Sequence, residues 1–171
     1  NITKKNSLQA FPYNKYHCTG WNVNQSAAII VCSEKIADEL DIPQEKRVYP
    51  LASSENNHMI GTLQRPKLYE QHGMQLAAKY ILDVCQKLKI EPNFYDLYSC
   101  FPVAVQMFAE SLNLNDYKKF TITGGMSFAG GPLNSYVLHS LAKMVSKIRK
   151  TKDSSGIITG VSGMMTKQSY A

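Results

Sequence analysis

The sequence predicts an α/β fold, with helices packed on a sheet of five strands. Two observations lead to this prediction. Short runs rich in β-branched and aromatic residues alternate with longer segments whose apolar residues recur at helical spacing. The chain has 171 residues, of which 44% are hydrophobic, and this is enough to bury one sizeable core. In such a fold, functional residues gather where the strands reach their carboxyl ends.

The first half of the chain is predicted to hold two strands and two helices. Residues 27–32 form an apolar run typical of a strand buried on both faces. Ser33 is placed to cap a short helix after it, and residues 47–52 have the pattern of a second strand. A polar loop follows over residues 53–66, and residues 67–88 carry the apolar spacing of a long amphipathic helix.

The second half is predicted to repeat the order strand, turn, helix twice. Residues 94–99 form a third strand, and Pro102 stands where the first turn of a helix tolerates proline. Residues 119–123 form a fourth strand, and the helix after it carries an apolar face that ends at Ile148. A last strand or hairpin begins at residue 157.

Charge and cysteine content narrow the classes of function. The net charge is +6, but much of it gathers near one helix end, where cations offset the helix dipole. These cations are Lys143, Lys147, Arg149, Lys150 and Lys152. The phosphates of an anionic ligand are an alternative partner for them, whereas the lack of interleaved aromatic residues argues against nucleic acid. The four cysteines are widely spaced and match neither a metal site nor a disulfide framework.

Hydropathy and the start of the chain bear on its location and extent. No run of 18 apolar residues occurs and the N-terminus lacks the apolar core of a secretory signal, so we expect a cytoplasmic protein without a membrane span. The chain starts at Asn1 with a polar, unpatterned stretch. We therefore expect residues 1–20 to be an N-terminal segment or linker, and residues 21–171 to form one compact domain.

Two connections between a strand and a helix are candidates for chemistry. In the first, Ser99 and Cys100 lie beside the N–H groups that open a helix and favour negative charge. A thiol there can be activated, although a free cysteine is also often a small buried hydrophobe. The second is residues 123–132, which hold four glycines. This backbone can approach a ligand closely and direct N–H groups at an anion, or the glycines can serve only to form the turn.

His58 is the third candidate. It lies in the long polar loop, with Glu55 close to it in sequence. It can serve as an acid or a base, or lie solvated without a role.

Taken in order, these segments resemble the C-terminal half of the thiolase superfamily, in particular acetyl-CoA acetyltransferase-like and sterol-carrier-protein thiolases. Residues 22–33 are similar to the NDGAAA segment and the strand after it. Residues 98–101 fall at the NEAF or HDCF box, and residues 124–132 resemble the GGAIALGHP turn. The histidine of GHP falls on Gly131, and the cysteine of the last box, CxGGG, falls on Gly160.

The resemblance implies a thiolase-like C-terminal domain, in which a five-stranded mixed sheet carries helices as half of a layered αβαβα arrangement. It implies a coenzyme A thioester as substrate, with no covalently bound cofactor and no metal. It also implies an N-terminal half, in the same chain or a separate one, that holds the nucleophilic cysteine. Because the family is commonly dimeric or tetrameric, a homodimer or higher oligomer is expected.

The resemblance also assigns roles to residues. It implies substrate-binding positions at Tyr98, Ser99, Gly130, Gly131 and Asn134. Since the family's histidine and cysteine are absent, Cys100 and His58 are the candidates for the acid–base roles. The first hypothesis is an acyl-CoA acyltransferase of thiolase type, with a variant active site, that works in lipid metabolism by acyl transfer or thiolysis. The alternative is a non-catalytic thiolase-like protein or subunit that binds acyl-CoA or lipid.

Overall fold

A four-stranded mixed sheet forms the centre of the computed structural model, which describes residues 2–163 and 165–171. Its strands, in the order β3-β6-β5-β4, are β3 (Ser54–Asn56), β6 (Lys167–Tyr170), β5 (Gly156–Ser162) and β4 (Phe94–Asp96). β4 and β5 are parallel, whereas β6 is antiparallel to both β5 and β3. Three strands therefore run in one direction, and the carboxyl ends of β3, β5 and β4 lie at the same end of the sheet.

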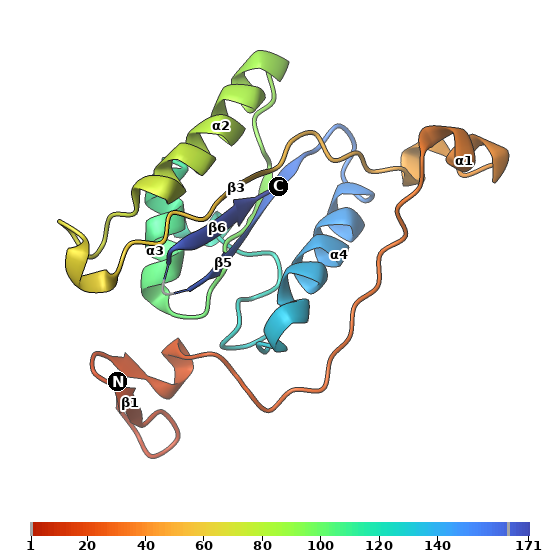
Figure 1. Ribbon diagram of the computed structural model, residues 1–171. Helices are drawn as coiled ribbons and strands as arrows, with labels where there is room; N and C mark the ends of the chain where they lie inside the picture. Colours follow the sequence, from red (N-terminus) through yellow and green to blue (C-terminus); the bar gives the residue numbers. More distant parts are fainter. Residues whose placement is uncertain (1, 164) are drawn as a thin grey trace.

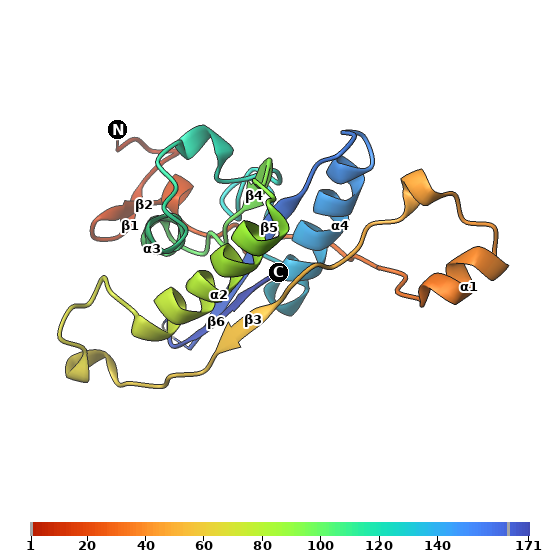
Figure 2. The same cartoon turned by 90° about the horizontal axis from the view of Figure 1, so that it is seen from above.

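Helices cover both faces of this sheet (Figures 1 and 2). Helices α2 (His72–Leu88) and α3 (Pro102–Ser111) lie on one face, where α2 contacts β3 and β6. Helix α4 (Tyr136–Ile148) lies on the other face, against β5 and β4. The sequence predicted all three helices, α2 and α4 from apolar spacing and α3 from the position of Pro102, and the α/β class with a mixed sheet is confirmed.

The main core lies between the sheet and the pair α2 and α3. Phe108 of α3 is completely buried, and its ring meets that of Tyr170 from β6 edge to face at 5.3 Å between centroids. Leu97, Ile81 and Met74 are buried around them. This core ties the last strand of the chain to two helices that precede it, and it fixes the position of β4.

Residues 2–46 contribute no side chain to this core, although residues 19–23 pack against the glycine turn. Strands β1 (Leu8–Ala10) and β2 (Tyr13–Asn14) pair as a small hairpin. Helix α1 (Glu34–Glu39) is capped as predicted, because the Ser33 hydroxyl accepts from Ile36 N at 3.3 Å, and Figure 1 shows it standing away from the sheet. Single turns of 3-10 helix occur at Lys15–His17, Gln44–Lys46, Thr62–Gln64, Tyr117–Lys119 and Leu133–Ser135.

Two of the predicted strands are wrong. Residues 27–32 and 47–52 are extended but unpaired in the part of the chain that the structure describes, and Ile30 is 93% exposed. An apolar β-branched run becomes a strand only where a neighbouring backbone takes its hydrogen bonds, and no such backbone lies beside these segments. Strand β3 forms instead in the following polar stretch, because those residues pair with β6.

The predicted fourth strand, residues 119–123, is also wrong. The main sheet has four strands rather than five among the described residues, since three predicted strands do not form, β3 is added, and the last predicted element is the hairpin of β5 and β6. The segment does lie beside β4, since Leu97 N donates to Phe120 O at 2.9 Å. Beyond that bond, its N–H groups turn to the side chain of Asp96 instead of a strand. A buried carboxylate thus takes the donors that would have continued the ladder.

Candidate functional site

Two segments that lead into helices meet at the end of the sheet where β4 stops. One runs from Asp96 through residues 97–101 into α3, and the other runs from residues 120–132 into α4. The bond between Leu97 N and Phe120 O holds them side by side. The two segments that the sequence singled out as candidates thus lie side by side.

The buried carboxylate of Asp96 organises the start of the glycine turn. The side chain is 0% exposed and accepts hydrogen bonds from five donors. The donors are the hydroxyls of Thr121, Thr123 and Ser140 and the backbone N–H groups of Ile122 and Thr123. A buried carboxylate is stable only when its oxygens are satisfied in this way. Asp96 therefore joins the turn to both β4 and α4.

Most N–H groups of the glycine turn are used within the protein. Gly124 N and Gly125 N donate to the hydroxyls of Thr121 and Thr123 at 3.0 and 3.2 Å. Further along the turn, Gly131 N donates to the carbonyl of Gly20 at 3.0 Å. An oxyanion hole needs N–H groups that point at empty space. In this arrangement the N–H of Gly131 is not free to meet an anion.

A segment near the N-terminus packs into the second glycine pair. A Cβ atom added at Gly131 would lie 2.1 Å from Cγ2 of Thr19, and one added at Gly130 would lie 2.4 Å from Cγ1 of Val23. Gly20 N also donates to Met126 O at 2.9 Å. Gly130 has φ of +91°, which favours glycine in any case. The glycines at 130 and 131 thus allow residues 19–23 to approach closely.

Cys100 lies at this same place. The Thr19 hydroxyl donates to the Cys100 carbonyl at 3.0 Å, and the thiol is partly buried. Burial raises the pKa of the Cys100 thiol, and hydrogen bonds from the backbone at Phe101 and Cys100 offset this only in part. The group is therefore a protonated thiol at neutral pH, suited to donate a proton rather than to attack as a thiolate.

Tyr98 and Ser99 are fixed by contacts with β5, with Tyr136 and with the glycine turn. Tyr98 N donates to Oγ1 of Thr159 in β5 at 2.9 Å, and its ring meets that of Tyr136 edge to face at 5.5 Å. Burial raises the pKa of Tyr98, and the neighbouring Cys100 adds to the shift. Ser99 Oγ accepts from Met126 N at 2.9 Å. Both residues lie in the connection from β4 to α3.

Two other predicted site residues lie further out. Asn134 is exposed in the 3-10 turn before α4. His58 is exposed just beyond β3, where its backbone N–H donates to Asn56 Oδ1 at 2.8 Å. β6 and β5 separate β3 from β4, which corresponds to roughly 14 Å between the ends of the two outer strands. In the described chain no hydrogen bond or ion pair joins His58 to Cys100, and the structure does not bring this pair together.

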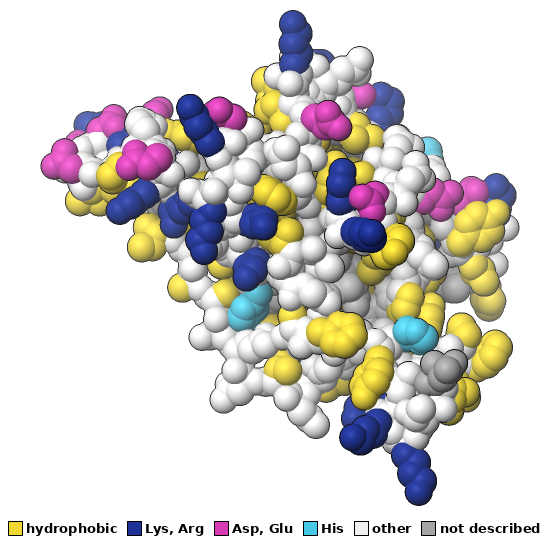
Figure 3. All heavy atoms as spheres, turned by 180° about the vertical axis from the view of Figure 1, so that it is seen from behind, with side chains coloured by type: hydrophobic (Ala, Val, Ile, Leu, Met, Phe, Trp, Pro, Cys, Tyr) yellow, Lys and Arg dark blue, Asp and Glu magenta, His cyan; other side chains and the backbone are white. Residues whose placement is uncertain are grey.

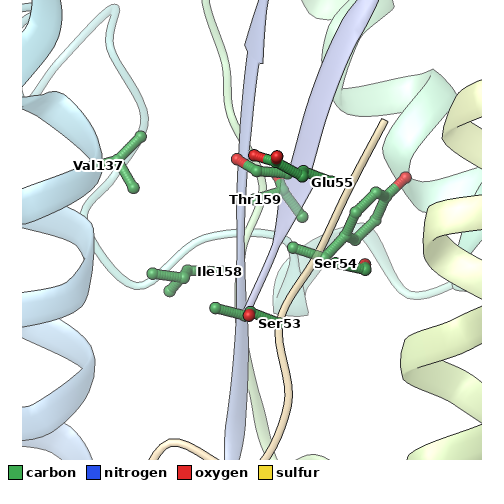
Figure 4. A pocket seen from close by; sticks show the side chains of 9 residues that line it. Ser53, Ser54, Glu55, Val137, Ile158 and Thr159 are labelled. Carbon is green, nitrogen blue, oxygen red and sulfur yellow. The ribbon is translucent and has the colours of Figure 1, made fainter. Parts of the chain in front are cut away.

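An open hollow of about 380 Å³ lies on the sheet face beside α4 (Figure 4). Val137 faces it from α4, and Glu55 and Thr159 come from the strands. Because the Thr159 hydroxyl also binds Tyr98 N, the hollow adjoins the candidate site. Its lining residues are Ser53, Ser54, Glu55, Val137, Ile158, Thr159, Ser169, Tyr170 and Ala171.

Figure 3 shows several basic side chains on one face of the molecule. Two basic residues near the end of α4 have other contacts: Lys147 Nζ lies 5.2 Å from the Phe94 ring centre, and Arg149 Nε donates to Lys46 O at 2.7 Å. Both lie at the end of α4 far from the glycine turn, about 18 Å along the helix. No group of three metal-ligating side chains occurs among the described residues, and no helix there is long and apolar enough to cross a membrane.

Several important residues escaped the sequence reasoning. Asp96 ends a buried strand, and the pattern Thr-x-Thr before a glycine pair supplies its donors, so an acidic residue at that position was the available signal. Thr19 had no such signal. It lies 81 residues from Cys100 in sequence, in a segment without pattern.

Comparison with solved structures identifies the fold. The SCP2-thiolase-like protein type 1 of Mycobacterium smegmatis, described as monomeric, is similar with a TM-score of 0.86 and 27% identity over 99% of this chain. This chain spans 38% of the length of that protein. The dimeric peroxisomal thiolase of Saccharomyces cerevisiae has a TM-score of 0.49 and 16% identity over 79% of this chain and 31% of its own. No protein-family model and no curated protein matches the chain.

The α/β fold with its mixed sheet, and the two turns at its edge, therefore define a thiolase-like domain. The similarity to the SCP2-thiolase-like protein supports membership of this chain in the thiolase superfamily.

Proposed function

We propose that this chain is part of a thiolase-like protein that binds a coenzyme A thioester at the edge formed by Tyr98, Ser99 and residues 124–132, without itself supplying the acid–base groups of acyl transfer. The observation that carries the proposal is the contact at Gly131. Cγ2 of Thr19 occupies the space that any side chain at this position would need. An acid–base group cannot be placed there without moving residues 19–23.

The state of the two substitute groups supports binding over catalysis. The raised pKa of Cys100 keeps it as a thiol, and His58 lies beyond two intervening strands. Proton transfer requires the donor and acceptor within hydrogen-bond reach of the same reacting atoms. These two residues do not meet this condition together.

Acyl transfer of the thiolase type, including thiolysis of coenzyme A thioesters, is the second candidate. The position of Cys100 favours it, since Thr19 links this residue to the glycine turn. In that case Cys100 acts as the acid, and activity is lost as the pH rises through its raised pKa.

Calorimetric titration with acetyl-CoA and an acyl-exchange assay on the intact protein separate the two candidates. Binding without exchange, unchanged in Cys100→Ala and His58→Ala, is the result expected for a binding protein. Exchange that falls at least tenfold in Cys100→Ala, while Cys100→Ser keeps the fold and the binding, contradicts the proposal. A covalent acyl-enzyme trapped on the intact protein contradicts it as well.

We also propose that an N-terminal half of the thiolase type, in the same or a separate chain, packs against this chain and completes the site. We further propose that the protein is a homodimer or larger oligomer and lies in the cytoplasm. The unpaired apolar segment at residues 27–32 supports this, since Ile30 and Val31 are 93% and 87% exposed. Light scattering on the intact protein tests the oligomer. A monomer at all concentrations would remove that part of the proposal.

A further inference from the structure

Three basic side chains form a row along one flank of α4. His139, Lys143 and Lys147 follow one another at intervals of four residues, which places them on the same side of the helix. Lys143 and Lys147 are exposed, and His139 is half-buried. These three residues are the basic row of α4.

The basic row begins at the glycine turn and continues beside β4. His139 Nε2 lies 3.4 Å from Ser135 Oγ, and this hydroxyl donates to the carbonyl of Pro132, the last residue of the turn, at 3.1 Å. At the other end, Lys147 Nζ lies 5.2 Å from the centre of the Phe94 ring in β4. The row therefore connects the candidate site to the amino end of β4.

Helix formation does not account for the charges of this row. Helix α4 contains no Asp or Glu, and no ion pair joins Lys143 or Lys147 to a carboxylate in the part of the chain that the structure describes. On α2, by contrast, Lys79 pairs with Asp83 at 2.7 Å. Like charges four residues apart destabilise a helix, and the helix dipole favours cations only in the last turn. The dipole thus explains Lys147 but not Lys143, which lies in the middle of α4.

We infer that the basic row of α4 binds the nucleotide phosphates of the coenzyme A thioester whose acyl end lies at Tyr98 and the glycine turn. This inference rests on the proposed function and adds a second part to the same site. Exposed ammonium groups attract phosphate oxygens through charge-assisted hydrogen bonds.

The length of the ligand agrees with this placement. The ring of Tyr136, the first residue of α4, meets that of Tyr98 at 5.5 Å, and Lys143 and Lys147 lie about 11 and 17 Å further along the helix. The pantetheine arm has about 13 bonds from its sulfur to the first phosphorus, and it spans about 15 Å when it is as extended as a peptide backbone. A thioester held at Tyr98 can therefore bring its phosphates to the two lysines.

Calorimetric titration of the intact protein with acetyl-CoA and with S-acetylpantetheine, which lacks the nucleotide, tests the inference. The wild type is expected to bind acetyl-CoA more tightly. Lys143→Gln with Lys147→Gln should weaken acetyl-CoA about two- to thirtyfold, the range for two exposed ion pairs, and leave S-acetylpantetheine within about twofold. Lys143→Arg with Lys147→Arg keeps both charges and should retain binding. Lys79→Gln with Lys87→Gln is the matched control, because it removes the same net charge from α2 on the other face of the sheet.

The outcomes separate this inference from the proposed function. If the Lys143→Gln, Lys147→Gln variant binds acetyl-CoA as the wild type does, or if the control weakens it equally, the inference is overturned, while binding of S-acetylpantetheine still upholds the proposed function. If the wild type binds neither thioester, the proposed function fails. Titration with adenosine 3′-phosphate 5′-diphosphate then decides on the row: binding that is lost in the Lys143→Gln, Lys147→Gln variant supports a phosphate site, and no binding overturns it.

Discussion

The contact between Thr19 and Gly131 leads to a double-mutant prediction. Gly131→Ala adds a methyl group 2.1 Å from Thr19 Cγ2, whereas two carbon atoms prefer about 3.5–4.0 Å. Thr19 cannot easily rotate away, because its hydroxyl binds the Cys100 carbonyl at 3.0 Å. The structure must therefore shift by about 1.5 Å at a buried position, and such overpacking costs about 1–3 kcal/mol of unfolding free energy.

Thr19→Ser removes the clashing methyl group and keeps the hydroxyl. Alone it should cost about 0.8 kcal/mol, the value of one buried methyl group. In the double variant the alanine methyl group occupies the vacated space, so Gly131→Ala should then cost little. The expected coupling free energy is about 1–2 kcal/mol in favour of the double variant.

Urea unfolding of the four proteins of this cycle measures the coupling. Gly61→Ala is a matched control, because its added Cβ would meet only the end of the Gln64 side chain at 3.4 Å. It should cost little and show no coupling to Thr19→Ser. If Gly131→Ala costs the same with and without Thr19→Ser, the close approach of residues 19–23 to the turn is refuted.

Three further predictions use the buried groups of the domain. Because burial raises the pKa of Cys100 while Cys32 is exposed, iodoacetamide at pH 8 should label Cys32 first, and equal rates would contradict the burial of Cys100. Burial also raises the pKa of Tyr170, so the folded state holds this proton more tightly than the unfolded chain; its contribution to stability is complete below about pH 10 and is lost at higher pH. Urea midpoints from pH 8 to 11 should fall less in Tyr170→Phe than in the wild type, and parallel curves would exclude this linkage. Phe108→Ala should cost about 3–5 kcal/mol in urea unfolding, whereas Phe128→Ala, at a side chain 79% exposed, should stay within about 0.5 kcal/mol.

The helices were more predictable from the sequence than the strands, for a physical reason. Apolar spacing and caps lie within the helix itself, so α2, α3 and α4 appear where residues 67–148 predict them. A strand needs a partner that the local sequence does not specify. Residues 27–32 have the composition of a strand and no partner in the described chain, whereas the polar residues of β3 found one in β6.

Part of the candidate site was predictable from the sequence, and part was not. Ser99 and Cys100 were predictable, because β4, a turn and α3 follow one another there. The glycine turn lies at the same end of the sheet, although the strand predicted before it does not form. The contacts that hold these residues in place were not predictable from the sequence. Thr19 comes from a distant segment, and the donors of Asp96 come from residues 121–123 and from α4.

Glycine at position 131 therefore has a different meaning in the structure than in the sequence. In the sequence it marks the loss of a histidine from a motif. In the structure its missing side chain is the condition for Thr19 to pack there and for Gly131 N to bind Gly20 O. Since both contacts would be broken by a larger residue, restoring an acid–base group requires changes in residues 19–23 as well. The absence of a histidine at position 131 and the close packing of residues 19–23 are therefore linked, and this supports the proposal of ligand binding without catalysis.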